Sequence, residues 1–178
     1  LSSWVLTING QGLNSLSVDD LQYFQSRFFL VPGTGTVYID AKLSVIRERA
    51  VGNGFHEELT ILSHENEPVD LEVRIEAASD FADLFEVKDA LKKLGTYVSR
   101  VEDGRLYLGY KRKTFKRETI ISASAPASVD ELGLTFSVRI EPHATWTTDL
   151  DVVTSEAGAA GTYARPKYER GRKQARPN

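Results

Sequence analysis

Residues 69–77 alternate between apolar and polar side chains without interruption. The apolar members of this segment would share one face of a strand: Val69, Leu71, Val73 and Ile75. A period of two is typical of an antiparallel strand with one buried face. Residues 134–140 repeat the pattern, and residues 144–152 continue it after Pro142. The sequence therefore predicts half-buried strands in these segments.

Two tight turns are indicated by the pairs Asn53-Gly54 and Asp103-Gly104. Both suit a two-residue type I′ turn, whose central residues need the positive φ that Asn, Asp and Gly tolerate. Strict pairing about Asn53-Gly54 sets Arg49 opposite Glu58 and places Glu48 in an apolar neighbourhood. Either Glu48 has a cationic partner there, or the true register differs by one residue.

Turn signals separate short strand-like segments along most of the chain, and residues 65–68 are expected to close a hairpin into the strand at 69–77. Helix is scarce, with short helical turns at most near residues 18–24 and 80–94. This organisation favours an all-β fold, an antiparallel β-sandwich, over alternating strands and helices.

Charge divides the chain into two parts. Residues 155–178 carry six basic and two acidic side chains, so their net charge is +4. Because the net charge of the whole chain is −3, that of residues 1–154 is −7. The basic part is too poor in apolar side chains to order itself, so we interpret it as a flexible linker following a folded domain at 1–154. An acidic folded part argues against nucleic-acid binding.

The remaining composition narrows the class of protein. The chain has no cysteine, which excludes disulfides and thiolate metal sites. No apolar run is long enough to span a membrane, and residues 1–4 do not resemble a signal peptide, so we expect a soluble, cytoplasmic protein. The absence of methionine suggests a piece of a longer polypeptide.

An acidic cluster follows the strand at 69–77. Asp80, Asp83 and Glu86 recur at every third position and would share a face of one helical turn. They could simply cap that turn, or they could bind sugar hydroxyls, a cation or a neighbouring domain. Carboxylates that point the same way do not flank a glycosidic bond, so we predict no catalytic residue in this cluster.

Other candidate chemistry is sparse. The three histidines, His56, His64 and His143, lack metal-ligand spacing, and no nucleophile or phosphate-loop motif occurs. We therefore predict no metal and no cofactor. Trp4 and Trp146 lie in strand patterns and are expected to pack in the core.

Three tyrosines flank the turn at Asp103-Gly104: Tyr97, Tyr107 and Tyr110. Because sugar rings stack on aromatic side chains, these tyrosines could form a binding platform. Arg47, in the segment before the other predicted turn, is a further candidate for contact with sugar or a neighbouring domain.

Three segments resemble the N-terminal domain of bacterial and archaeal glycogen-debranching-type enzymes, the amylo-α-1,6-glucosidase-like proteins. They are residues 43–49, residues 54–61 and, most specifically, the run Ala77-Ala-Ser-Asp-Phe-Ala-Asp-Leu-Phe-Glu-Val87. The resemblance extends in order over most of residues 1–154, including the opening residues 1–10. The resemblance implies a galactose-mutarotase-like supersandwich that precedes an (α/α)6-barrel catalytic domain. The catalytic residues of such a protein would lie beyond Asn178, so the resemblance assigns none to this chain and implies that it is inactive alone.

The leading hypothesis is a non-catalytic accessory domain that docks to, or shapes the approach to, this α-1,6-glucosidase barrel. A second hypothesis is an independent module that binds α-glucan through the tyrosines around residues 97–110. A third is a free-standing sugar-epimerase-like enzyme, which would require one of the histidines to face a common site with a glutamate.

Overall fold

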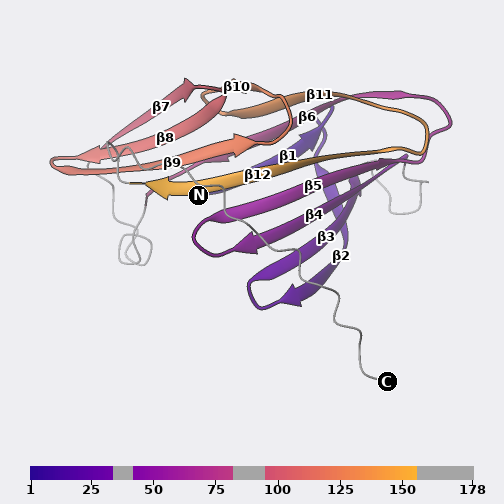
Figure 1. The fold of residues 1–178 in the computed structure, drawn as a ribbon, viewed down its shortest axis with the longest axis horizontal. Helices are drawn as coiled ribbons and strands as arrows, with labels where there is room; N and C mark the ends of the chain where they lie inside the picture. The colour runs from indigo at the N-terminus through magenta and orange to yellow at the C-terminus, as the bar shows by residue number, and fades with distance from the viewer. Residues whose placement is uncertain (34–41, 82–94, 156–178) are drawn as a thin grey trace.

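The chain folds as a β-sandwich in a computed structural model that describes residues 1–33, 42–81 and 95–155. The described residues form twelve strands and no helix, and hence no helix that could cross a membrane. The strands make two antiparallel sheets packed face to face (Figure 1). The predicted all-β antiparallel sandwich is confirmed.

The smaller sheet has four strands in the order β1-β6-β11-β10. Their bounds are Ser3–Ile8 for β1, Val69–Ala78 for β6, Gly133–Ile140 for β11 and Ser128–Asp130 for β10. Both strands with uninterrupted alternation, β6 and β11, are paired at its centre. Their apolar positions are buried and their charged positions face outward, as the pattern predicts.

The larger sheet has eight strands in the order β2-β3-β4-β5-β12-β9-β8-β7. Their bounds are Leu13–Gln22 for β2, Gln25–Pro32 for β3, Leu43–Val51 for β4, Phe55–Ser63 for β5, Thr145–Ser155 for β12, Phe115–Ala123 for β9, Arg105–Arg112 for β8 and Thr96–Glu102 for β7. We call the side that packs on the smaller sheet the inner face and the opposite side the outer face.

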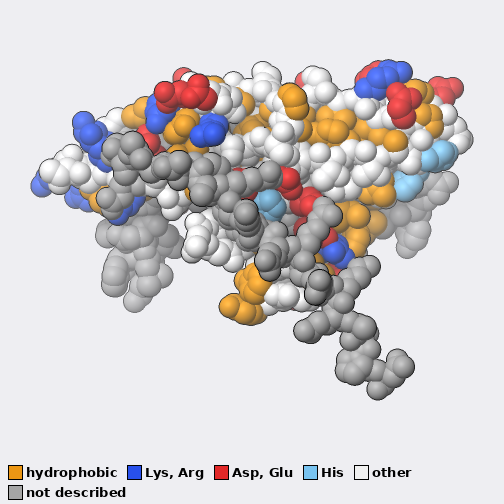
Figure 2. All heavy atoms as spheres, viewed as in Figure 1, with side chains coloured by type: hydrophobic (Ala, Val, Ile, Leu, Met, Phe, Trp, Pro, Cys, Tyr) orange, Lys and Arg blue, Asp and Glu red, His pale blue; other side chains and the backbone are white. Residues whose placement is uncertain are grey.

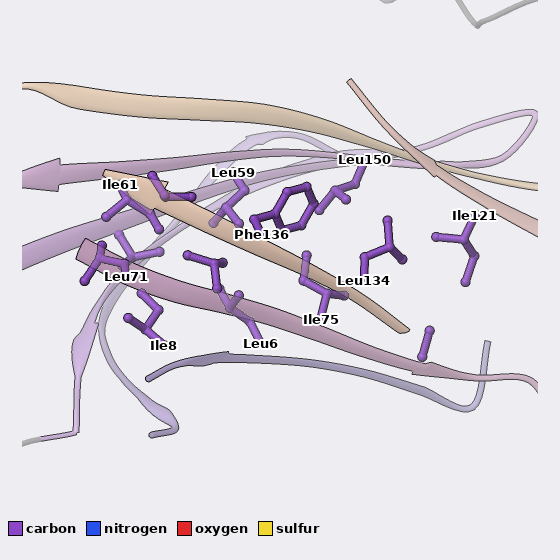
Figure 3. Packing of buried hydrophobic residues seen from close by; sticks show 14 of the residues in the cluster. Leu6, Ile8, Leu59, Ile61, Leu71, Ile75, Ile121, Leu134, Phe136 and Leu150 are labelled. Carbon is purple, nitrogen blue, oxygen red and sulfur yellow. The ribbon is translucent and has the colours of Figure 1, made fainter. Parts of the chain in front are cut away.

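The core lies between the two sheets (Figure 3). Its largest fully buried side chains include Phe136, Leu59, Ile75, Ile121 and Leu150, which come from both sheets. Burying one such side chain stabilises the fold by roughly 1.5–3 kcal/mol. Both tryptophans pack against this cluster, as predicted, and the Trp146 ring meets the Phe136 ring edge-on at 5.4 Å.

Residues 65–68 do not close a hairpin, contrary to the prediction. Strand β5 pairs with β4 and β12 in the larger sheet, whereas β6 pairs with β1 and β11 in the smaller sheet. The connection therefore crosses from one sheet to the other. Alternation looks the same in either sheet, so it could not reveal the change.

The two predicted tight turns have different outcomes. Asp103 and Gly104 have φ angles of 50° and 68° and join the paired residues Glu102 and Arg105, so the type I′ turn is confirmed. At the other turn Val51 pairs with Phe55, which makes a three-residue loop. Gly54 is needed there because a Cβ would lie 2.7 Å from the carbonyl oxygen of Val152.

The register of β4 on β5 therefore differs by one residue from strict pairing about Asn53-Gly54. Arg49 lies opposite Glu57 instead of Glu58. Glu48 faces outward opposite Glu58, and its Oε1 accepts a hydrogen bond from Arg27 Nε at 2.6 Å. The predicted register of β4 on β5 was therefore wrong, and Glu48 also has a cationic partner, Arg27, as the alternative prediction required.

Residues 18–24 form no helical turn. Residues 18–22 belong to β2, and Tyr23 and Phe24 make the turn into β3. Strands β2 and β3 project beyond the region that the smaller sheet covers (Figure 1), and β2 is exposed along most of its length. The helical turn considered near 80–94 lies almost entirely outside the described residues.

An exposed ion pair closes the β10–β11 turn. Arg74 donates to both carboxylate oxygens of Asp130, at 2.6 and 3.0 Å, and Asp130 Oδ1 also accepts from the backbone N–H groups of Leu132 and Gly133 at 2.8 and 2.9 Å. The hydrogen bond from Arg74, more than these backbone contacts, lowers the pKa of Asp130 to about 2.

Titration of Asp130 should follow this geometry. Because the folded pKa is lowered, ionised Asp130 stabilises the fold above its usual pKa of 3.8, and that contribution is lost as the pH falls towards about 2. Carboxyl NMR should show the lowered pKa, and Arg74→Gln should raise it towards 3.8. Arg139→Gln, which removes a cation bonded to Asp70, should leave it unchanged. Titration of wild-type Asp130 near 3.8 would contradict the assignment.

Candidate functional site

The acidic turn is only partly within the described residues. Asp80 is exposed just after β6, and its carbonyl oxygen accepts a hydrogen bond from the Tyr97 hydroxyl at 2.9 Å. Asp83 and Glu86 lie outside the described residues. A role of this cluster in sugar or domain contact therefore stays a prediction.

The three candidate tyrosines do not share one surface. Tyr97 and Tyr110 lie opposite each other on the inner face, with ring centroids 5.3 Å apart, and Tyr110 is buried. Tyr107 lies on the outer face, where the Arg100 guanidinium sits 3.8 Å from its ring centroid. The structure brings two of the tyrosines together and separates the third from them.

Each histidine has a different hydrogen-bond partner. His64 bonds Ser44 at 2.7 Å and His143 bonds Asn66 at 3.0 Å through their side chains. His56 lies on the outer face, with Nδ1 2.7 Å from Asp151 Oδ1. Glu58 lies on the same face, two positions further along β5, and His56 contacts aspartates.

The outer face carries an acidic band across the middle of the larger sheet. Paired positions on β4, β5 and β12 place Glu48, Glu58 and Asp149 in one row. Figure 2 shows acidic side chains gathered around a histidine over these strands. Within the described residues, no group of three or more His, Asp or Glu side chains has the geometry to hold a metal ion.

Three charged side chains on the inner face form a buried cluster. Glu57 is fully buried, its Oε1 accepts hydrogen bonds from Arg47 Nε and Nη2 at 3.0 and 2.7 Å, and its Oε2 accepts one from Arg49 Nε at 2.6 Å. Burial lowers the pKa of Arg47, and the attraction of Glu57 opposes that shift. We call these residues the Arg47–Glu57–Arg49 cluster.

Arg47 therefore lies behind the surface, because only 7% of the residue is exposed. The Arg49 side chain is 29% exposed and reaches further out. Its guanidinium lies 5.0 Å from the Phe28 ring centroid and 5.8 Å from that of Phe55. Two aromatic rings and one carboxylate thus fix the orientation of Arg49.

A pocket of about 560 Å³ opens beside Arg49, at the end of the sandwich where β1 begins. We call it the Arg49 pocket, and its lining residues come from the N-terminal residue, from β1, β4, β5, β9 and β12, and from the loop at 52–54. Aromatic and apolar walls are provided by Leu1, Trp4, Val51, Phe55 and Val152, and polar groups by Arg49, Asn53, Thr119 and Thr154. This mixture is typical of a small-ligand site.

Sequence reasoning missed the Arg49 pocket. The available signal was a set of charged residues at inward positions, 47, 49 and 57, among apolar neighbours. That signal is readable only in the observed register, where Arg49 lies opposite Glu57. The predicted register paired Arg49 with Glu58, an outward residue, and so hid the cluster.

Comparison with solved structures shows that the fold is similar to one part of a larger protein. A candidate kojibiose phosphorylase from the human microbiome aligns with 85% of this chain at a TM-score of 0.58 and 11% identity. The aligned part is 21% of that protein, so the chain spans about a fifth of its length. A polysaccharide lyase aligns with 83% of this chain and 26% of its own, at 12% identity and a TM-score of 0.43, too low to bear on the fold.

Sequence comparison is more specific. The search among curated proteins gave no match. A profile that describes the N-terminal domain of some glycogen debranching enzymes matches residues 1–151, which is nearly all of the described structure. The chain therefore belongs to the family of N-terminal domains of glycogen debranching enzymes.

Proposed function

We propose that the domain is a non-catalytic accessory domain of a glycogen-debranching-type glycoside hydrolase. It docks against the catalytic α-1,6-glucosidase domain, an (α/α)6 barrel, of the same polypeptide. The observation that carries the proposal is an exposed apolar surface at the projecting end of the larger sheet, which we call the β2–β3 tip.

The β2–β3 tip is defined by four apolar residues: Val18, Tyr23, Phe24 and Val51. Tyr23 is 100% exposed and Val51 61% exposed. The N–H of Val51 donates to the carbonyl oxygen of Phe24 at 3.0 Å, which ties the end of β4 to the β2–β3 turn. Figure 2 shows hydrophobic side chains at this end of the molecule. Exposed apolar side chains that gather in one region are typical of a protein interface, and aromatic residues are enriched there.

The choice of partner follows from the family. Its members are N-terminal domains of enzymes, so further chain is expected to follow the sandwich. The aligned phosphorylase, which likewise carries this fold in 21% of its length, supports the same arrangement. A catalytic domain in the same polypeptide is present at a high effective concentration, so a modest apolar surface suffices for docking.

Two carboxylates of the domain, Glu57 and Asp130, have structural uses. Hydrolysis of a glycosidic bond needs two carboxyl groups that reach the substrate from opposite sides. Glu57 is fully buried between two arginines and cannot reach a sugar. Asp130 forms a turn through Arg74 and backbone contacts. These uses support an accessory role.

Docking can be tested with the sandwich and the remainder of the polypeptide produced separately. We expect the two parts to associate, and Tyr23→Ser combined with Val51→Ser to weaken association by at least about tenfold, as expected for loss of aromatic and apolar anchors. Leu132→Ser, which changes an exposed leucine at the β10–β11 turn, is the matched control and should have no effect. Equal binding by the Tyr23→Ser/Val51→Ser double variant and the Leu132→Ser variant would refute this docking surface.

A measurement of glycoside hydrolase activity tests the non-catalytic role. The isolated sandwich should release no sugar from a maltosyl-branched glucan, whereas the complete enzyme should. Release of sugar by the sandwich alone would refute the non-catalytic role.

A further inference from the structure

We propose that the Arg49 pocket binds a short segment of α-glucan. This inference rests on the proposed function for the choice of glucan as the sugar. The walls and polar groups of the pocket independently favour an oligosaccharide.

The pocket has the size and the walls that a sugar needs. Its volume of about 560 Å³ lies within the range of roughly 300–1,000 Å³ that is usual for small-ligand sites. The Trp4 and Phe55 rings meet edge-on at 5.5 Å and form one aromatic wall. A pyranose ring presents C–H groups on its faces, which pack on aromatic carbon, and hydroxyl groups around its rim.

Polar groups line the same pocket and can form hydrogen bonds with the hydroxyl groups around a pyranose ring. The Asn53 side chain can both donate and accept hydrogen bonds, as can the Thr119 and Thr154 hydroxyls. Arg49 uses Nε for Glu57, and within the described residues its two terminal amino groups have no hydrogen-bond acceptor. The guanidinium contacts the rings of Phe28 and Phe55 and is bonded to Glu57, so it can donate to a ligand without losing much conformational freedom.

The indole N–H of Trp4, in this aromatic wall, is a hydrogen-bond donor without an acceptor among the described residues. Its nitrogen, Nε1, is buried. A buried donor without an acceptor costs about 1–3 kcal/mol. An oxygen-rich ligand seated against the indole could supply that acceptor after a small adjustment of the ring.

The position of the pocket fits the proposed arrangement of domains. Val51 belongs both to the pocket wall and to the β2–β3 tip, so the pocket opens beside the surface assigned to docking. A glucan segment held there would lie next to the catalytic domain. The accessory domain would then help to position the branched substrate.

The two tryptophans allow a direct test on the intact chain. Trp146→Phe leaves Trp4 as the only tryptophan, and Trp4→Phe leaves Trp146, which packs against Phe136 in the core. Titration with maltohexaose should change the emission of the Trp146→Phe protein in a saturable manner. The Trp4→Phe protein should show no saturable change, because its remaining indole lies outside the pocket.

NMR of the wild-type chain gives a second readout that needs no core substitution. Maltohexaose should shift the amide signals of Gly52, Asn53 and Gly54. Asn53→Ala should weaken binding about 2- to 10-fold, the effect of one hydrogen bond. Asn66→Ala, which changes an asparagine bonded to His143, is the matched control and should bind as the wild type does.

Several results would overturn the inference. They are the absence of amide shifts at tens of millimolar maltohexaose, an equal response to β-linked cellohexaose, and a response to inorganic phosphate alone. Each would leave the accessory role intact. Hydrolysis of a branched glucan by the chain would instead refute the proposed function, so the two failures are distinguishable.

Discussion

Replacing Glu57 by glutamine is expected to lower the free energy of unfolding by about 3–5 kcal/mol. Glu57 is fully buried and bonds both arginines of the cluster. The amide has a similar size but no charge, so Arg47, only 7% exposed, would keep its charge without a counterion. Because domains are usually stable by about 5–15 kcal/mol, the loss should be large in a urea titration.

A double variant separates the unpaired charge from lost packing. Replacing both Arg47 and Glu57 by leucine removes the buried ion pair and leaves apolar side chains in a core region. Such replacements are often neutral or stabilising, so we expect most of the loss to be recovered. Arg49 would lose its carboxylate, but its side chain is 29% exposed and can be hydrated.

Asp70→Asn is the matched control for the glutamine variant. Asp70 also pairs with an arginine, Arg139, at 3.0 Å, but both side chains are largely exposed. Exposed pairs contribute about 0–1 kcal/mol, so this loss should be small. If Glu57→Gln cost no more than Asp70→Asn, the Arg47–Glu57–Arg49 cluster would not depend on its charge.

The same cluster shows how far the sequence could predict the site. Alternation placed the strand at 69–77 correctly because every second residue there is charged and every other one is apolar. In β4 and β5 charged residues occupy both faces, so alternation gives no strong preference for either register. The turn signal then decided the register, and it was one residue out because Gly52 joins the loop.

Local sequence patterns do not predict contacts between segments that are distant in the sequence. The Arg49 pocket combines residues from β1, the loop at 52–54 and the end of β12. The choice of sheet for β6, and therefore the failed hairpin at 65–68, is likewise decided by long-range packing. The family resemblance predicted the sandwich as a whole, but it contains no information on which polar residues share a pocket.

Replacing Gly133 by alanine is expected to lower the free energy of unfolding by at least about 3 kcal/mol, near the upper end for overpacking. Gly133 begins β11, and a Cβ there would lie 2.0 Å from the carbonyl oxygen of Ile75. That oxygen belongs to the central strand β6, so it cannot rotate away as a side chain would. The strands would have to separate beside the hydrogen bond from Ala77 N–H to the Leu132 oxygen, which measures 3.0 Å.

Two other glycines provide a graded control for urea unfolding. A Cβ at Gly12 would meet nothing within 4 Å, and one at Gly109 would lie 3.4 Å from the Val98 oxygen, an ordinary contact. Alanine at Gly12 should be neutral or stabilise by up to about 1 kcal/mol, since it restricts the unfolded chain. The order of stability should therefore be Gly12→Ala, then Gly109→Ala, then Gly133→Ala. A Gly133 variant as stable as the Gly109 variant would mean that β11 shifts on β6 at little cost, contrary to a tightly paired central strand.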